Sequence, residues 1–295
     1  MKSDMPRVVL WMLGTLASFV VLAVSLRALT GAAAGALTVF EVLALRNIGG
    51  IVILGAWALL RARDGIGAPR PLWLHATRNV FHFAGQALWT TGLTLLPIAT
   101  VFALEFTAPA WTVVLAVLFL GERLTAGRVG AVALGFVGVL IILRPGLGAF
   151  DPAGLIVLAA AAMFGVQLIT TKRLTGSNTV LNILFWMNVM QLPMYLAAAG
   201  LTGRAPWIFP HLTAPMIPAL IGLCTSGLLA HVCVTNAFRH GDAIVVVPLD
   251  FLRVPLIAVV GVFLYGERFD PMVLLGAVVT AAGILWNIRA ETRRS

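Results

Sequence analysis

The residues most able to do chemistry are six ionisable side chains inside long apolar stretches of the sequence: Glu41, Arg46, Arg78, Glu105, Asp250 and Arg253. At the centre of a lipid bilayer, each would cost about 2.5–3.5 kcal/mol. Six such charges facing lipid would together exceed the net stability of a typical fold. We therefore expect them to face a protein interior or water, either as structural ion pairs or along a path for a substrate or protons.

The clearest pattern is a polar stripe within residues 73–95. Arg78, His82, Gln86 and Trp89 follow one another at spacings of four, four and three, and Asn79 shares the face of Gln86. At about 100° per residue, these five side chains fall on one side of a helix. A guanidinium, an imidazole, two amides and an indole suit an organic anion or zwitterion with a flat apolar part. The alternative is a hydrogen-bonded seam between helices, which uses the same residue types.

Glu105 and Asp250 each precede a phenylalanine within an apolar stretch. Asp250 and Arg253 are three residues apart and can pair within one helix. Glu105 has no such partner, because Ala108 stands at the equivalent position. Glu105 is therefore the stronger candidate for a proton-binding group or a substrate ligand, and Asp250 and Arg253 are further candidates.

Two more tryptophans, Trp111 and Trp186, lie in apolar stretches and complete the candidate site. Together with Trp89 they would suit a flat aromatic ligand, although tryptophan also packs without any ligand. Prolines near Glu105 and Asp250 remove backbone hydrogen bonds, and the resulting kinks fit either a moving gate or ordinary packing. These prolines are Pro109, Pro248 and Pro255.

The elements that must position these side chains are membrane helices. Hydrophobic residues make up 60% of the 295-residue chain and charged residues only 11%, against about 25% in ordinary soluble domains. Apolar runs of about 18 residues or more can cross a hydrocarbon core of about 30 Å. The sequence predicts an all-α integral membrane protein with ten transmembrane helices, at residues 8–30, 36–60, 73–95, 98–120, 127–144, 152–171, 179–200, 213–238, 242–264 and 271–289.

The net charge of +9 does not indicate nucleic-acid binding, because the basic residues lie between the apolar spans and not on one face or in a tail. Basic residues placed in this way encode membrane topology. If the N-terminus is cytoplasmic, thirteen basic residues lie in inside segments and four in outside segments. The sequence therefore predicts a multi-pass protein in the lipid bilayer, with both termini in the cytoplasm.

The chain also repeats itself. Residues 104–144 align without gaps on residues 249–289 after a shift of 145 positions, and ten of the 41 positions are identical, including the Gly-Glu-Arg triplets. Each repeat holds five helices, an odd number, so the second copy must enter the membrane upside down. We expect two inverted five-helix repeats, 1–148 and 149–295. Such repeats are typical of secondary transporters, whose binding site lies near the midplane between the repeats.

Small residues in the last span of each repeat allow close helix contact. Contact within one chain is the simpler interpretation, and a homodimer surface is the alternative. The residues are Gly127, Ala131, Gly135 and Gly138 in the fifth span, and Gly276 and Gly283 in the tenth.

Other function classes find little support in the sequence. Cys224 and Cys233 are too far apart along one helix for a disulfide, and no metal-binding, cofactor or phosphate-binding motif is present. We therefore expect no cofactor, no bound metal and no catalytic residues. His82 with Glu105 is the one pair that an intramembrane enzyme could use, and a non-transporting membrane subunit is a second alternative.

Several of these features together resemble one transporter family. Ten spans, two five-helix repeats, Arg46 in the second span and two segments that end in Gly-Glu-Arg resemble the EamA type of the drug/metabolite transporter superfamily. The two segments are Leu104–Arg123 and Leu249–Arg268. The stretch around Arg78, His82, Glu105 and Pro109 also looks similar to the riboflavin-importing branch of that family.

The resemblance implies a carrier in the bacterial inner membrane. Its substrate would be a small organic molecule such as an amino acid, a drug or a vitamin-like solute, moved by alternating access. We also hypothesise that Glu105 or Asp250 couples this transport to protons. The family has no invariant substrate-binding motif, so the candidate site residues rest on the helix-face argument alone.

Overall fold

Long apolar runs form the helices of this chain, and turns rich in glycine, proline and charged residues separate them. The computed structural model describes residues 5–30, 37–60, 66–108, 110–112, 114–115, 126–144, 151–174, 176–201, 212–240, 249–250 and 252–292. No residue in these ranges lies in a β-strand, so the predicted all-α class agrees with the structure. The helices are α1 (Met5–Thr30), α2 (Val39–Leu60), α3 (Leu72–Leu95), α4 (Ile98–Glu105), α6 (Ala126–Leu143), α7 (Ala153–Leu174), α8 (Val180–Leu201), α9 (Ile217–His240), α11 (Arg253–Tyr265) and α12 (Pro271–Thr292), with a short 3-10 helix η3 (Ala214–Met216).

Five stretches of described helix are long and apolar enough to cross a membrane, judged by length and composition: Pro6–Thr30, Val39–Leu60, Ala153–Thr171, Val180–Leu201 and Ala214–Val234. Shorter apolar stretches occur in α6, α11 and α12. Helix α3 has 24 residues, which is also enough to span, but it is the least apolar of the described helices. Its polar stripe explains this difference, because a helix that lines a polar interior cannot be apolar on every side.

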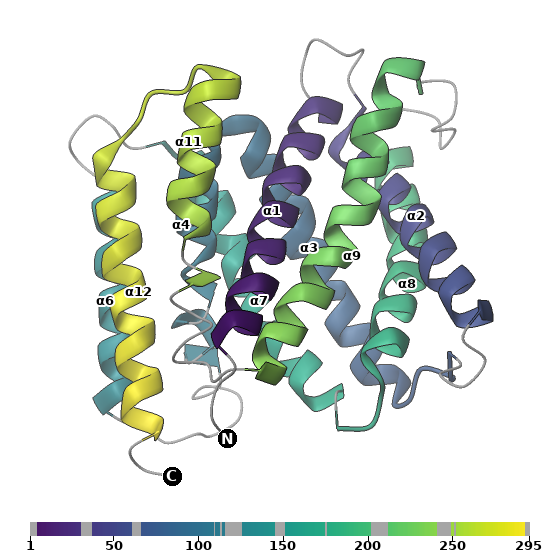
Figure 1. The fold of residues 1–295 in the computed structure, drawn as a ribbon, viewed down its shortest axis with the longest axis horizontal. Coiled ribbons are helices and arrows are strands. Elements are labelled where there is room, and N and C mark those ends of the chain that lie inside the picture. Colours follow the sequence, from purple (N-terminus) through teal and green to yellow (C-terminus); the bar gives the residue numbers. More distant parts are fainter. Residues whose placement is uncertain are drawn as a thin grey trace.

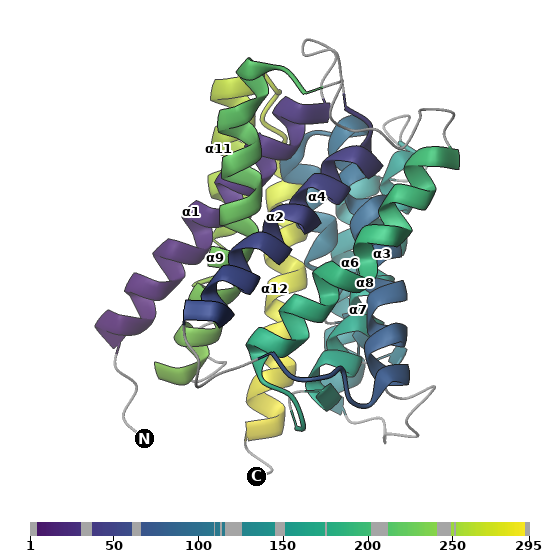
Figure 2. The same ribbon diagram turned by 90° about the vertical axis from the view of Figure 1, so that its right-hand side faces the viewer.

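The helices pack in pairs that join the two halves of the chain. The most extensive contacts are those of α6 with α12, α1 with α9, α3 with α7 and α2 with α8, and α4 packs on α11. Figure 1 shows α4, α6, α11 and α12 on one side of the molecule, α2 and α8 on the other, and α1 with α9 between them. The same five pairs result when each helix of the first half swaps places with its counterpart in the second half. The counterparts are α1 and α7, α2 and α8, α3 and α9, α4 and α11, and α6 and α12. Helix α1 begins and α12 ends at the same end of the bundle (Figure 2).

The predicted span 98–120 is not one continuous helix. It begins as α4, but the helix ends at Glu105 and residues 106–107 form a turn before helical structure returns at Ala108. The backbone N–H of Thr107 bonds to the carbonyl three residues earlier. Such a tighter turn interrupts the regular ladder of α-helical hydrogen bonds.

The predicted span 242–264 is interrupted at the equivalent place. Residues 249–250 are helical, Leu252 lies in a turn, and α11 starts at Arg253. Residues 241–248 lie outside the described part of the chain. This second interruption comes just after Asp250, which the shift of 145 positions aligns with Glu105.

The prolines expected to kink these spans account for only part of this geometry. Pro109 and Pro248 lie outside the described residues, and Pro255 is the third residue of α11, where the backbone N–H has no partner within the helix. Irregular backbone at membrane depth is tolerated only where it faces protein or a water-filled cavity. The breaks therefore indicate that Glu105 and Asp250 lie in a protected interior.

Helices α6 and α12 approach closely at Gly138 and Gly276. A Cβ atom on Gly138 would lie 2.6 Å from the carbonyl oxygen of Gly276, and a Cβ atom on Gly276 would lie 2.6 Å from that of Gly138. This contact lies within one chain, as the simpler interpretation of the small residues expects. The homodimer surface stays a prediction.

Replacing Gly138 with alanine should lower the melting temperature of the detergent-solubilised protein. The added methyl group meets backbone, which cannot move aside, and overpacking of this kind costs about 1–3 kcal/mol. The control is Gly200→Ala in α8, where a Cβ atom meets nothing within 4 Å. Alanine is the better helix former, so the control should be neutral or slightly stabilising. Equal melting temperatures for the two variants would contradict the close packing of α6 on α12.

Candidate functional site

Arg253 joins the two acidic residues of the predicted site. It is the first residue of α11 and is 5% exposed. Its guanidinium lies 3.6 Å from the Glu105 carboxylate and 3.4 Å from the Asp250 carboxylate. The predicted Asp250–Arg253 pair is present, and Glu105 has no such partner within its own helix, as expected. Glu105 finds its partner across the bundle, which a spacing argument within one helix cannot detect.

Aromatic rings surround the Arg253 guanidinium. Its central carbon lies 3.9 Å from the centre of the Phe19 ring in α1, 4.7 Å from that of Phe106 and 5.4 Å from that of Phe102. Ring faces attract a cation, and the attraction is stronger where water is excluded. Phe19 belongs to this site but could not be predicted from the sequence, because nothing distinguishes it from the other apolar residues of its span.

The acidic cluster, which we define as Glu105, Asp250 and Arg253, carries a net charge of −1 when both carboxylates are ionised. Glu105 Oε2, Asp250 Oδ1 and Arg253 Nε are buried and meet no hydrogen-bond partner among the described residues. The indole of Trp89 lies beside Glu105, but its N–H is outside hydrogen-bonding geometry. These unused polar atoms are available to a proton, to water or to a polar substrate.

The polar stripe of α3 is buried on all five positions, Arg78, Asn79, His82, Gln86 and Trp89. It faces α7 and α8. Arg78 Nε donates to the hydroxyl of Thr171 at 2.9 Å, and Arg78 Nη1 donates to Asn79 Oδ1 at 3.1 Å. His82 Nδ1 lies 3.0–3.2 Å from the amide of Gln191 in α8. A hydrogen-bonded seam between helices is therefore present, and the ligand pocket on the same face stays a prediction.

The C-terminal part of the stripe reaches the acidic cluster. The Trp89 ring packs edge-on against Phe102, with ring centres 5.4 Å apart, and Gln86 donates weakly to Thr90 at 3.4 Å within α3. Eleven residues separate Arg78 from Trp89, which is about 16 Å along a helix. The buried face of α3 thus connects the surroundings of Arg78 with the acidic cluster.

The other two predicted tryptophans make their contacts elsewhere. The Trp111 ring packs edge-on against Phe136 of α6, with ring centres 5.4 Å apart. Trp186 donates its indole N–H to the carbonyl of Gly67, in the connection between α2 and α3, at 2.7 Å. Packing and a backbone hydrogen bond account for both positions without a ligand.

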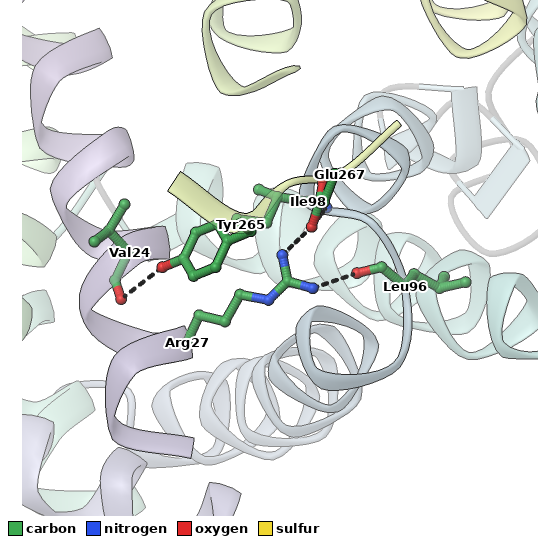
Figure 3. Close-up of polar contacts among 6 residues, drawn as sticks. All are labelled: Val24, Arg27, Leu96, Ile98, Tyr265 and Glu267. Carbon is green, nitrogen blue, oxygen red and sulfur yellow. Dashed lines mark hydrogen bonds and ion pairs between the residues drawn. The ribbon is translucent and has the colours of Figure 1, made fainter. Parts of the chain in front are cut away.

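A second polar network joins α1, the start of α4 and the turn after α11 (Figure 3). Arg27, in the last turn of α1, forms an ion pair with Glu267, in the turn between α11 and α12. Glu267 also accepts hydrogen bonds at 3.0 and 3.2 Å from the backbone N–H of Ile98, so it caps the N-terminus of α4. Arg27 donates to the carbonyl of Leu96 at 3.4 Å. A cavity of about 270 Å³ between α4, α11 and α12 has Glu267 in its wall and none of the ten predicted site residues.

Further contacts reinforce this network. The Tyr265 hydroxyl donates to the carbonyl of Val24 at 3.4 Å, and the Arg27 guanidinium lies 4.7 Å from the centre of the Tyr265 ring. Arg144, just after α6, forms an ion pair with Asp270, just before α12. We call the contacts of Arg27 and Glu267 with α4 the end network, because they tie α1, α4 and α11 together.

Among the described residues, no group of three or more histidine, cysteine, aspartate or glutamate side chains is placed to hold a metal ion. Cys224 and Cys233 are both free thiols in α9. Cys224 packs on α2 and lies 3.8 Å from the carbonyl of Leu45. These positions agree with the expectation that the two cysteines are not paired.

Apolar helices that enclose broken segments and buried charges define a multi-pass membrane protein with a polar interior. The model of the EamA-like transporter family matches the chain twice, over residues 7–144 and 152–289. The chain therefore belongs to the EamA-like transporter family. The two matches begin 145 residues apart and also end 145 residues apart, which is the shift found within the sequence.

Similar proteins are named as transporters of several metabolites. A riboflavin transporter of Rhizobium johnstonii is 33% identical over 75% of this chain and 72% of its own length. An S-adenosylmethionine uptake transporter of Rickettsia bellii is 28% identical over 86% of this chain and 85% of its own. A protein of Streptantibioticus cattleyicolor named probable terminal-alkyne amino-acid exporter is 29% identical over 72% and 71%. A solved crystal structure with 18% identity has the same fold, with a TM-score of 0.63 over 97% of both chains.

Replacing Arg253 with glutamine should strongly destabilise the protein, because it leaves two buried carboxylates without their cation. Breaking a buried pair in this way costs about 3–5 kcal/mol. Adding Glu105→Gln and Asp250→Asn should recover much of that loss, because no uncompensated charge then remains. The measurement is the melting temperature of each variant in detergent. If the changes in melting temperature caused by the three substitutions were strictly additive, the three side chains would not interact as proposed.

Proposed function

We propose that the chain is a secondary carrier that moves a small organic metabolite across the bacterial inner membrane by alternating access. The observation that carries this proposal is the acidic cluster. It draws Glu105 from the first half of the chain and Asp250 and Arg253 from the second, at the breaks of two packed helices. In transporters with internal repeats, broken helices at the repeat interface form the site for substrates and coupling ions.

The two halves, residues 1–148 and 149–295, are proposed to be inverted repeats. The constant spacing of 145 residues between the two family matches supports this arrangement, as does the set of helix pairs that is unchanged when the halves are exchanged. Alternating access then amounts to a rocking of one half against the other around a fixed site.

The substrate would lie along the stripe of α3 and against the acidic cluster. The proposed binding residues at these two places are Arg78, Asn79, His82, Gln86, Trp89, Glu105, Asp250 and Arg253. Trp111 and Trp186 stay candidates from the sequence alone, because their contacts lie elsewhere. Riboflavin and S-adenosylmethionine, the compounds in the names of two relatives, both combine a flat aromatic ring system with a polar chain. A riboflavin-type vitamin importer is the specific alternative that the first of these relatives favours.

The end network is proposed to be the gate on the periplasmic side. With both termini in the cytoplasm, as the basic residues predict, the turn after α3 and the turn after α11 lie at the periplasmic end. Arg27 and Glu267 hold these turns against α1. Opening toward the periplasm would require this ion pair to separate.

Coupling to protons is proposed to occur at the acidic cluster. Two carboxylates share one guanidinium, and each has a buried oxygen without a partner among the described residues. Adding one proton would bring the net charge of the cluster to zero. A neutral cluster is more stable than a charged one in a low-dielectric interior.

Transport is tested with the purified protein in sealed liposomes. We expect saturable uptake of at least one labelled compound from a panel of riboflavin, S-adenosylmethionine and amino acids, above the level of protein-free liposomes. Uptake by the chain alone would exclude a non-transporting subunit, and recovery of the compound unchanged would exclude an enzyme. No flux for any compound, from a protein that stays folded, would count against the carrier.

In the same liposomes, Glu105→Gln should abolish accumulation driven by a pH gradient while exchange of substrate across the membrane continues. The amide cannot lose or gain the coupling proton, but it keeps the size and polarity of the side chain. Full concentrative transport by Glu105→Gln across a pH series would remove Glu105 from the coupling role.

Arg27→Gln should favour the state that is open to the periplasm. A partly exposed ion pair contributes on the order of 1 kcal/mol, so labelling of a cysteine behind the gate should rise roughly fivefold. The probe is Thr107→Cys, a buried position two residues after Glu105, with Cys224 and Cys233 replaced by serine and a membrane-impermeant maleimide added outside. Arg27→Lys keeps the charge and should label like the parent. If the probe cysteine were labelled equally in Arg27→Gln and in the parent, the end network would not be the periplasmic gate.

A further inference from the structure

Two arginines on the α2–α8 side of the interior have no carboxylate partner among the described residues. Arg78 is 2% exposed, and its hydrogen bonds go to neutral side chains. Arg46, in α2, has a buried Nη2 that meets no hydrogen-bond partner in the described part of the chain. Both guanidinium groups interact electrostatically with His82 of α3 and with His231 of α9. We call these four side chains the basic cluster.

A second unused donor lies beside Arg46. Tyr195 of α8 is fully buried, and its hydroxyl meets no partner among the described residues. Tyr195 and Arg46 interact electrostatically, and the Tyr195 ring packs on Phe83 of α3 with ring centres 4.6 Å apart. A guanidinium N–H and a phenol O–H that interact electrostatically are thus both buried, and neither meets an acceptor among the described residues. An oxygen of an anion would satisfy both donors and compensate the positive charge.

His231 of α9 adds a further polar side chain near the two arginines. It lies seven residues after Cys224, and therefore on the face of α9 that packs toward α2. Its side chain is solvent-exposed. Helices α3 and α9 begin and end 145 residues apart, so His231 is equivalent to Gln86. Equivalent positions in the two halves thus present polar side chains to this region.

We propose that the basic cluster binds an anionic group of the transported metabolite, so that the substrate class is organic anions or zwitterions with a carboxylate or phosphate. The inference rests on the proposed transport function and narrows its substrate. Guanidinium groups in a low-dielectric interior are strongly destabilised without a counter-charge. A carboxylate or phosphate supplies that charge and matches the planar donors of arginine.

The dimensions also fit an elongated molecule. The stripe of α3 extends about 16 Å from Arg78 to Trp89, and Trp89 lies beside the acidic cluster. A metabolite anchored by its anionic group at Arg46 and Arg78 would place its remaining polar groups along this stripe. A cationic or hydrogen-bonding group at its far end could then reach the unused oxygen of Glu105.

The test uses two pairs of compounds that differ mainly in one anionic group. Flavin mononucleotide adds a phosphate to riboflavin, and S-adenosylmethionine adds a carboxylate to its decarboxylated form. Binding to the purified protein is measured by thermal stabilisation at constant ionic strength, and uptake is measured in liposomes. We expect the anionic member of at least one pair to bind about tenfold more tightly, and the pair concerned identifies phosphate or carboxylate as the group recognised.

Arg46→Gln and Arg78→Gln should each bring that ratio close to one, because each weakens binding of the member with the anionic group far more than binding of the member without it. Arg289→Gln, an exposed position near the end of α12, is the matched control and should leave the ratio unchanged. A purely structural role for Arg78 predicts a lower melting temperature of the ligand-free variant. Removal of an unpaired buried charge predicts an unchanged or higher one.

Inorganic phosphate is a probe that does not depend on the organic scaffold. It should stabilise the parent protein more than the Arg46→Gln/Arg78→Gln double variant. Equal binding of both members in each pair, or no stabilisation by phosphate or by any anionic compound, would overturn the anionic subsite. Uptake that continues in that case leaves the transport function standing, whereas absence of uptake of every compound counts against the transport function itself.

Discussion

A guanidinium held between two carboxylates from different halves of the chain is the interaction on which the rest of the interior depends. In a hydrocarbon environment none of the three charges can remain alone without a large destabilisation, so Arg253, Glu105 and Asp250 must stay together. That requirement fixes where α4 meets α11, and the rings of Phe19 and Phe102 fix where α1 and α4 pack against both. Removing Arg253 leaves two carboxylates uncompensated, whereas removing either carboxylate leaves a neutral pair.

The helix breaks follow from this constraint. A continuous helix through Glu105 or Asp250 would satisfy every backbone group internally and leave the carboxylate as the only polar element. Ending α4 at Glu105 and starting α11 at Arg253 instead brings polar backbone and charged side chains together. The repeat is not symmetric at this point, because Ala108 stands where the second half has Arg253. One cation therefore serves two acids, and the cluster keeps an excess negative charge.

The sequence predicted what depends on local spacing. The apolar runs gave most of the helices, and the spacing of Arg78, His82 and Gln86 placed them on one buried face, because helical periodicity is a property of neighbouring residues. It could not predict that Glu105 meets Arg253, a residue 148 positions later, since no local pattern reports a contact across the bundle. The pairing of Arg27 with Glu267 could not be predicted for the same reason. A tryptophan side chain can either bind a flat ligand or pack against other residues, so the sequence could not predict its role. In the structure, Trp111 packs on Phe136 and Trp186 donates to a backbone carbonyl.

Two clusters of opposite charge in one interior cannot act independently. A proton bound at Glu105 or Asp250 removes a negative charge that would otherwise repel an anion held at Arg46 and Arg78. By linkage, a bound anion must favour that protonation by the same free energy. The buried face of α3 joins the clusters over a distance at which charges in a low-dielectric medium still interact. Coupled movement of an anion and a proton would therefore need no direct contact between them, only the shared interior that Glu105 and Arg78 line.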